Sequence, residues 1–275
     1  MGNKFIYEQY DNIYKFMDII TERPHNGKFP SFADGSADTG DPRWYGTPDW
    51  ETAMEQFQNG IPEAAEKLKH SLASFKANPA FTSRVKPRNY YYGYAPNVPA
   101  AIIGLPKSMR QMNRQPQKIK TVTLISNACV LSDVSASDLQ KHGETVLNLV
   151  YALEKSGYRV QLELLISATD CDNRGDLFCS IILKEYKQAL DIMKLSFPLT
   201  SPSMFRRFGF RWKETMVNLP GTGRNHGRSY KSPEIKRLYT ANGIDFKNKY
   251  IISHADSKAA GYDALKLAKA LDLMI

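Results

Sequence analysis

The stretch that decides the fold runs from Lys118 to Thr169 and reads KIKTVTLISNACVLSDVSASDLQKHGETVLNLVYALEKSGYRVQLELLISAT. Its two apolar runs, residues 121–131 and 158–166, are too short to span a membrane. Between them, apolar residues recur at helical spacing, and Gly157 ends that pattern. The stretch therefore predicts strand, helix, strand. Two strands joined by a helix of this length favour a parallel, right-handed crossover, which is the nucleus of an α/β sheet.

The rest of the C-terminal half continues this alternation. Strands are expected at residues 177–183 and 249–253, and helices at 186–195, 203–215 and 263–274. This order predicts an α/β domain over residues 116–275, with a mostly parallel sheet and helices on both faces.

Residues 1–115 have a different character and are expected to form a helical and Tyr/Pro-rich N-terminal region. Apolar spacing predicts a helix over residues 3–23, followed by a Gly/Pro/Ser/Asp-rich loop at 26–41. A second helix is expected after Thr47 as N-cap and Pro48 as first residue, and a third from Pro62.

Composition limits the class of protein. With 275 residues, 42% of them hydrophobic and 24% charged, the chain can bury a substantial core. It contains no apolar run of membrane-spanning length and no signal peptide, so we expect a cytoplasmic protein, in the host bacterium if a phage encodes it. Cys129, Cys171 and Cys179 lack metal-ligand spacing and are expected to be reduced.

The net charge of +9 favours polyanionic partners. Residues 201–250 hold 11 Lys and Arg against 3 Asp and Glu, a net charge of +8. Residues 218–229 add a Gly-rich loop that is not a P-loop but suits an anion. A solvated basic face is the alternative. The predicted nucleic-acid-binding residues are Arg206, Arg207, Arg211, Lys213, Arg224, Arg228, Lys236 and Arg237.

Residues 84–114 are rich in Tyr and Pro and place four tyrosines among Arg and Lys residues. Such a pattern is typical of a platform on which nucleic-acid bases stack. Tyrosines packed across the edge of a sheet would give the same sequence, and this structural interpretation is the preferred one here.

Residues 133–137 spell Asp-x-Ser-x-Ser directly after the first predicted strand. The chain from Lys118 onward resembles von Willebrand factor A-like domains in three respects. They are this motif, the order strand, motif, helix, strand, and the late Tyr250–Asp256 segment. That resemblance implies a three-layer core and a divalent cation, Mg²⁺ or a similar ion, held by Asp133, Ser135 and Ser137. His254 stands where such domains commonly have Asp, and a serine before Asp138 is also typical of a helix N-cap. No cofactor is otherwise expected.

The acidic turn at residues 169–176 offers a rival, enzymatic interpretation. Asp170, Asp172 and Asp176 near Glu185 would suit a metal-dependent nuclease. The five histidines show no zinc spacing, and no serine or cysteine has a nucleophile-elbow context.

Two further segments resemble an uncharacterised family of bacteriophage and prophage proteins. They are residues 44–60, which begin Trp-Tyr-Gly-Thr-Pro-Asp-Trp, and residues 93–109, in which Asn97 replaces an acid of the family pattern. The resemblance covers most of the chain and implies no catalytic residues. We therefore expect a non-catalytic phage-type protein that contacts nucleic acid or a protein partner, with a metal-dependent enzyme or a virion component as alternatives and no membrane partner.

Overall fold

The structure, a computed structural model, describes residues 4–23, 42–75, 88–111, 120–131, 133–169, 175–215 and 230–273. Its strands are Lys4–Tyr10 (β1), Arg88–Tyr90 (β2), Ala95–Pro96 (β3), Met109–Gln111 (β4), Thr121–Asn127 (β5), Arg159–Thr169 (β6), Gly175–Lys184 (β7) and Lys249–Ile252 (β8). Its helices are Ile13–Glu22 (α1), Pro42–Tyr45 (α2), Trp50–Asn59 (α3), Pro62–Ser74 (α4), Val98–Ile102 (α5), Ala136–Lys155 (α6), Ile192–Thr200 (α7), the π-helix Met204–Gly209 (η2), Phe210–Glu214 (α8), Ser232–Ala241 (α9), His254–Ala259 (α10) and Ala264–Ala270 (α11).

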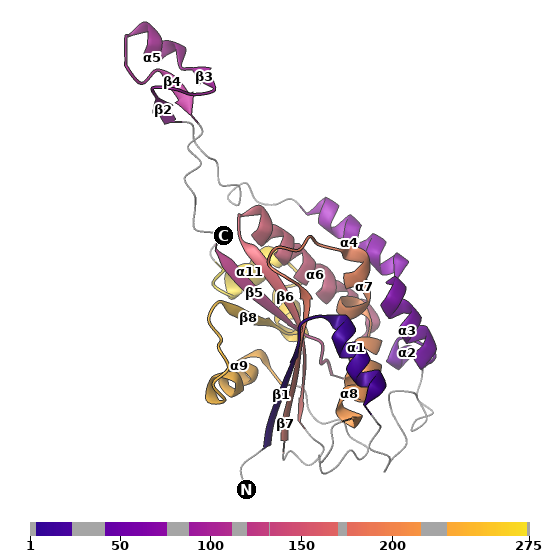
Figure 1. The fold of residues 1–275 in the computed structure, drawn as a ribbon. Helices are drawn as coiled ribbons and strands as arrows, with labels where there is room; N and C mark the ends of the chain where they lie inside the picture. The colour runs from indigo at the N-terminus through magenta and orange to yellow at the C-terminus, as the bar shows by residue number, and fades with distance from the viewer. Residues whose placement is uncertain are drawn as a thin grey trace.

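The large sheet has the strand order β1-β7-β6-β5-β8 (Figure 1). Strand β5 is parallel to both β6 and β8, and β1 is parallel to β7. The one reversal is between β6 and β7, which are antiparallel. The predicted α/β class and mostly parallel sheet are confirmed, and so is the strand, helix, strand nucleus of β5, α6 and β6.

Hydrophobic packing differs between the two faces of this sheet. One face carries the larger core, in which leucines and valines of α6 pack with residues of β5, β6, β7 and the helices α1, α3, α4, α7 and α8. The other face is covered by α9, whose Ile235 and Tyr239 pack against Ile125, Leu165 and Phe178. Each strand is therefore apolar on both faces, as expected for a mostly parallel sheet covered by helices.

Several expected elements differ from the structure. Residues 4–10 are a strand, in which Phe5 and Tyr7 pack toward the α9 side while Ile6 packs against the larger core. The helix begins only after the N-cap Asn12. Residues 186–191 are not helical, since Asp191 caps a helix that starts at 192. The N-cap of α3 is Asp49 rather than Thr47, whose hydroxyl lies buried against Ser203.

Two cysteines lie in the described ranges, and both are buried without a disulfide. Burial raises the pKa of the Cys129 thiol to about 12, so this thiol is inert as a nucleophile at neutral pH. Cys171 lies outside the described residues. Nor does any helix in the described ranges combine the length and apolar character that crossing a membrane requires.

A tight crossing of α6 and α7 yields a first prediction. A Cβ atom added at Gly143 would lie 2.8 Å from the Leu199 carbonyl oxygen and 2.9 Å from a Thr200 methyl group. Gly143→Ala should therefore lower the free energy of unfolding by about 1 to 3 kcal/mol, although alanine favours an exposed helix by about 1 kcal/mol. Urea unfolding followed by circular dichroism measures this, with the surface variant Lys141→Ala as control. Higher stability of Gly143→Ala would contradict the close crossing.

Candidate nucleic-acid interface

The structure places the arginines of η2 inside the protein. Arg206 and Arg207 are only 3% and 1% exposed. The Arg206 guanidinium donates to the carbonyl oxygens of Trp44 at 2.5 Å, Leu131 at 3.2 Å and Val134 at 3.3 Å, and its charge lies 4.6 Å from the Trp44 ring centre. Burial lowers its pKa to about 10, although nearby Asp133 acts in the opposite direction. Arg206 therefore ties the loop after β5 to helix α2.

The next predicted residues are also held by protein contacts. Arg207 donates through Nε to the Thr47 hydroxyl and through a terminal nitrogen to the Thr47 carbonyl, both at 2.8 Å. Arg211 donates to the carbonyl oxygens of Ile20 and Arg23 at 3.0 and 3.1 Å. Lys213 is 5% exposed. These side chains stabilise the fold, and phosphate binding would require them to leave these contacts.

The remaining predicted basic residues are separate from this group. Lys236 and Arg237 are exposed on α9, where the Lys236 ammonium lies 5.6 Å from the Phe246 ring centre. Arg224 and Arg228 lie outside the described residues. The expected continuous basic face from Arg206 to Arg237 is therefore not assembled by the described residues. The sequence signal that this helical segment is buried is the set of aromatic residues interspersed with its arginines. They are Phe205, Phe208, Phe210 and Trp212.

The predicted metal ligands lie at the carboxyl edge of the sheet. Ser135 is the N-cap of α6 and accepts from the Asp138 backbone N–H at 3.1 Å, while its hydroxyl lies 3.0 Å from that of Ser137. Asp133 is exposed near His254, whose pKa is lowered mainly by burial. No group of three His, Cys, Asp or Glu side chains within the described ranges is arranged to hold a metal ion.

The acidic turn after β6 is described only at its end. Asp176 is buried and accepts a hydrogen bond from the hydroxyl of Tyr230, whose ring stacks on Phe178 with centroids 5.3 Å apart. Asp170 and Asp172 lie outside the described residues, and Glu185 is exposed. Asp176 thus has a packing role in the structure.

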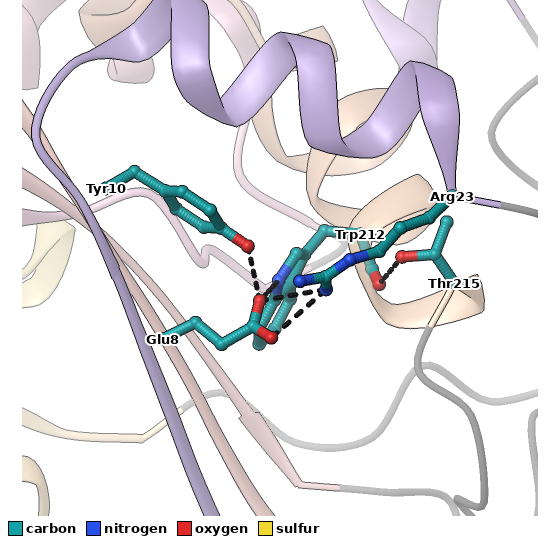
Figure 2. Close-up of polar contacts among 5 residues, drawn as sticks. All are labelled: Glu8, Tyr10, Arg23, Trp212 and Thr215. Carbon is teal, nitrogen blue, oxygen red and sulfur yellow. Dashed lines mark hydrogen bonds and ion pairs between the residues drawn. The ribbon is translucent and has the colours of Figure 1, made fainter.

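Figure 2 shows a polar cluster at the edge strand β1. The Glu8 carboxylate accepts from the Arg23 guanidinium at 3.1 Å, from the indole N–H of buried Trp212 at 2.8 Å, and from the Tyr10 hydroxyl. Burial is the main cause that raises the pKa of Tyr10. With its oxygens occupied by three donors, Glu8 joins β1 to α1 and α8 rather than offering a reactive carboxylate.

A different part of the chain presents exposed side chains. Residues 88–111 form the separate sheet β2-β4-β3 with the short helix α5, hereafter the lobe (Figure 1). Eight of the ten large hydrophobic side chains that are exposed in the described part of the chain belong to it. They are Tyr90, Tyr91, Tyr92, Tyr94, Val98, Ile102, Ile103 and Leu105. A concentration of this kind marks an interaction surface.

Backbone contacts fix the shape of the tyrosine-rich turn. The Tyr94 N–H donates to the Arg110 carbonyl at 3.0 Å, and the Asn97 N–H donates to the Ser108 carbonyl at 2.7 Å. A Cβ atom at Gly93 would lie 2.1 Å from the Arg110 carbonyl oxygen, so only glycine permits this approach. The turn therefore holds Tyr91 and Tyr92 outward, at 64% and 65% exposure, and Tyr94 at 62%.

The lobe lies in a segment of chain without acidic residues. Residues 67–132 contain 11 Lys and Arg and no Asp or Glu, so the other residues together carry a net charge of −2 against +9 for the whole chain. Within the lobe, Arg88, Lys107 and Arg110 are exposed. The Lys107 ammonium lies 5.4 Å from the Tyr91 ring centre. The sequence already shows this acid-free run, whereas the predicted binding residues lie in residues 201–250.

The tyrosine exposures separate the two interpretations of this segment. Tyrosines packed across a sheet edge would lose most of their exposed surface, whereas three of these four side chains keep more than 60% of it. Tyr90, at 37%, lies edge-on to Tyr92 with ring centroids 5.9 Å apart. The Lys107 ammonium and the Tyr91 ring thus share one exposed surface, which suits a polyanion that also carries flat rings.

The chain belongs to the family described as a domain of unknown function (DUF7192), which matches residues 3–275. No curated protein and no solved structure matches the chain.

Proposed function

We propose that this member of the DUF7192 family is a non-catalytic nucleic-acid-binding protein and that the lobe is its interface. The observation that supports this most is the exposure of Tyr91, Tyr92 and Tyr94 within a segment that has no acidic residue. Nucleic acid supplies phosphates for the exposed Arg88, Lys107 and Arg110, and its binding is not opposed by any nearby carboxylate of the lobe.

This proposal moves the interface away from the segment 206–237. Four of its predicted residues, Arg206, Arg207, Arg211 and Lys213, donate to the protein or are buried, as described above. Lys236 and Arg237 remain exposed on α9 and make a matched comparison for the cations of the lobe.

The test is a binding titration of the purified chain with labelled nucleic acid across a salt series, with Mg²⁺ present and absent. We expect the affinity to fall as the salt concentration rises, because the Lys and Arg side chains that contact phosphates release condensed counterions. Replacing Arg88, Lys107 and Arg110 with Gln should weaken binding and reduce the slope of log affinity against log salt by about 2 to 3, roughly one for each lost phosphate contact.

The control is the double variant Lys236→Gln, Arg237→Gln. It should retain most of the affinity and most of the slope of log affinity against log salt. If this pair removes binding while the triple variant of the lobe retains it, the interface lies on α9 and our assignment is wrong. Cleavage of the nucleic acid in Mg²⁺ would favour the enzymatic alternative.

A protein partner is the second candidate, and one observation favours it. Ile102 and Ile103, at the end of α5, are 78% and 71% exposed, and residues 95–106 contain no charged side chain. Base stacking does not require these aliphatic groups. In this alternative Ile102→Ser with Ile103→Ser should abolish association with the partner, as measured by co-purification and calorimetry, while leaving nucleic-acid binding intact.

We further propose that the core is von Willebrand factor A-like. The order β7-β6-β5-β8, with one antiparallel strand, supports this, as does the position of Asp133 close to His254 at the edge where β5 and β8 end. A divalent ion at Asp133, Ser135 and Ser137 would raise the melting temperature in Mg²⁺ or Mn²⁺, and Asp133→Ala would abolish the rise. No shift at millimolar ion would exclude this site. A phage origin and a place in a virion remain proposals that rest on the resemblance alone.

A further inference from the structure

We propose that the lobe selects single-stranded nucleic acid by stacking unpaired bases on Tyr91, Tyr92 and Tyr94. This inference rests on the proposed function, because it names the kind of nucleic acid that the same surface takes. Its starting point is that all three rings are more than 60% exposed on an otherwise folded turn. Outward rings at this density are a platform that base faces can cover.

The geometry of the lobe favours a single nucleic-acid strand over a duplex. In a duplex the face of each base is covered by its neighbours, and only base edges and phosphates are accessible in the grooves. A tyrosine ring that is to stack needs the face, which a single strand presents without the cost of unpairing. Proteins usually read the major groove with an α-helix or a two-stranded β-ribbon. The strands of the lobe have only two or three residues and α5 has five, so the lobe offers neither element at a useful length.

The contact between Lys107 and Tyr91 indicates how a base and a phosphate would be accommodated together. In the structure the Lys107 ammonium lies over the Tyr91 ring, 5.4 Å from its centre, in a cation–π arrangement. A base that stacks on this ring takes the place of the ammonium. The flexible lysine side chain can then pair with the phosphate beside that base, so the attraction of the cation is retained.

The turn supplies the spacing of the platform. Gly93 lets the chain approach the Arg110 carbonyl, and the Tyr94 N–H bonds to that carbonyl, so the tyrosines on either side of the glycine are fixed relative to β4. Arg110 lies in the middle of β4, paired with Asn89 of β2 and Ala95 of β3, and its side chain is exposed. One exposed cation thus lies on the central strand of the sheet whose β2–β3 turn carries the three tyrosines.

The experiment compares three labelled probes at one salt concentration with the full chain: a 20-nucleotide oligothymidine strand, an abasic strand of the same length, and a 20-base-pair duplex. The abasic strand keeps the phosphates and removes the bases. We expect the thymidine strand to bind at least tenfold more tightly than the abasic strand, and also more tightly than the duplex. Each stacked base contributes roughly 5- to 150-fold in affinity.

Matched variants assign the effect to the rings. Tyr91→Leu, Tyr92→Leu and Tyr94→Leu combined should reduce thymidine-strand affinity to the level of the abasic strand. The corresponding Phe triple variant keeps the rings and should retain the preference. The Ile102→Ser, Ile103→Ser variant, which leaves the tyrosines in place, should retain it as well.

The outcomes distinguish this inference from the proposed function. Equal binding of all three probes that the Leu variant leaves unchanged would overturn stacking and leave nucleic-acid binding in place. Tighter binding of the duplex would also overturn single-strand selection. Failure to bind any probe at low salt would overturn both proposals and make a protein partner of the lobe the better explanation.

Discussion

Arg207→Ala is expected to lower the free energy of unfolding by about 3 to 4 kcal/mol, because it removes charged hydrogen bonds inside the protein. The guanidinium is 1% exposed, donates twice to Thr47 at 2.8 Å and lies 4.6 Å from the Tyr45 ring centre. Alanine would leave a cavity and take a donor away from the buried Thr47 carbonyl. Urea unfolding followed by tryptophan fluorescence measures the loss.

Arg237→Ala is the matched control, since this arginine belongs to the same basic segment but is exposed on α9. Its free energy of unfolding should stay within about 0.5 kcal/mol of the original protein. A wild-type unfolding midpoint for Arg207→Ala, or equal losses in the two variants, would contradict the structural role assigned to Arg207.

Acidification from pH 6.5 to 4 is expected to destabilise the protein by about 3 kcal/mol through His142 alone. This side chain is buried between the hydroxyl groups of Ser126 and Ser257, at 3.2 and 2.8 Å from its ring nitrogens. Burial, with a smaller contribution from His254, lowers its pKa to about 4, while Asp256 acts in the opposite direction.

The sign follows from the number of protons that each state binds. The unfolded histidine takes up a proton near pH 6.5, whereas the folded one does so only near pH 4. The contribution of His142 to the free energy of unfolding is therefore fully present above pH 6.5. As the pH falls from 6.5 to 4, this contribution decreases by up to about 1.4 kcal/mol per pH unit. Urea midpoints at pH 7, 6 and 5 measure the slope.

His142→Gln should flatten this slope, because a neutral amide does not titrate. His254→Gln should flatten it less, since the pKa of His254 is also lowered but its side chain is only partly buried. If His142→Gln retains the full pH dependence of the original protein, the titration must be assigned to other groups.

The proposed interface also changes the interpretation of the basic composition. Net charge alone predicted an interface in residues 201–250. In the folded protein, however, several of those cationic side chains are buried against carbonyl oxygens and aromatic rings. The segment 67–132 has fewer aromatic residues to bury its cations against, and the cations that the lobe carries are exposed. A net charge therefore indicates a partner only after each charged side chain has been located.

Local periodicity predicted the elements around the nucleus. The strands β5 and β6, the helix α6 and its end before Gly157, whose φ is +89°, all follow from apolar spacing and one glycine. The strand β8 was predicted in the same way, and so was the helix α11, although it was expected over residues 263–274. These signals depend on neighbours in sequence, so no knowledge of distant contacts was needed.

Elements whose state depends on a distant partner were not predicted. Residues 4–10 fit a helical pattern, yet they form a strand because pairing with β7 satisfies one edge of their backbone and partly buries both faces. Antiparallel pairing of β6 and β7 likewise could not be read from either strand alone.

By itself, the amino-acid sequence determined the α/β class, the order of the central elements and the presence of a tyrosine-rich cationic segment. Only the tertiary structure decided that Arg206 and Arg207 are internal while Tyr91, Tyr92 and Tyr94 are exposed. The physical reason is that burial depends on which surfaces meet. A buried guanidinium is stable where carbonyls and aromatic rings surround it, and an aromatic ring stays in solvent where no core is close enough to cover it.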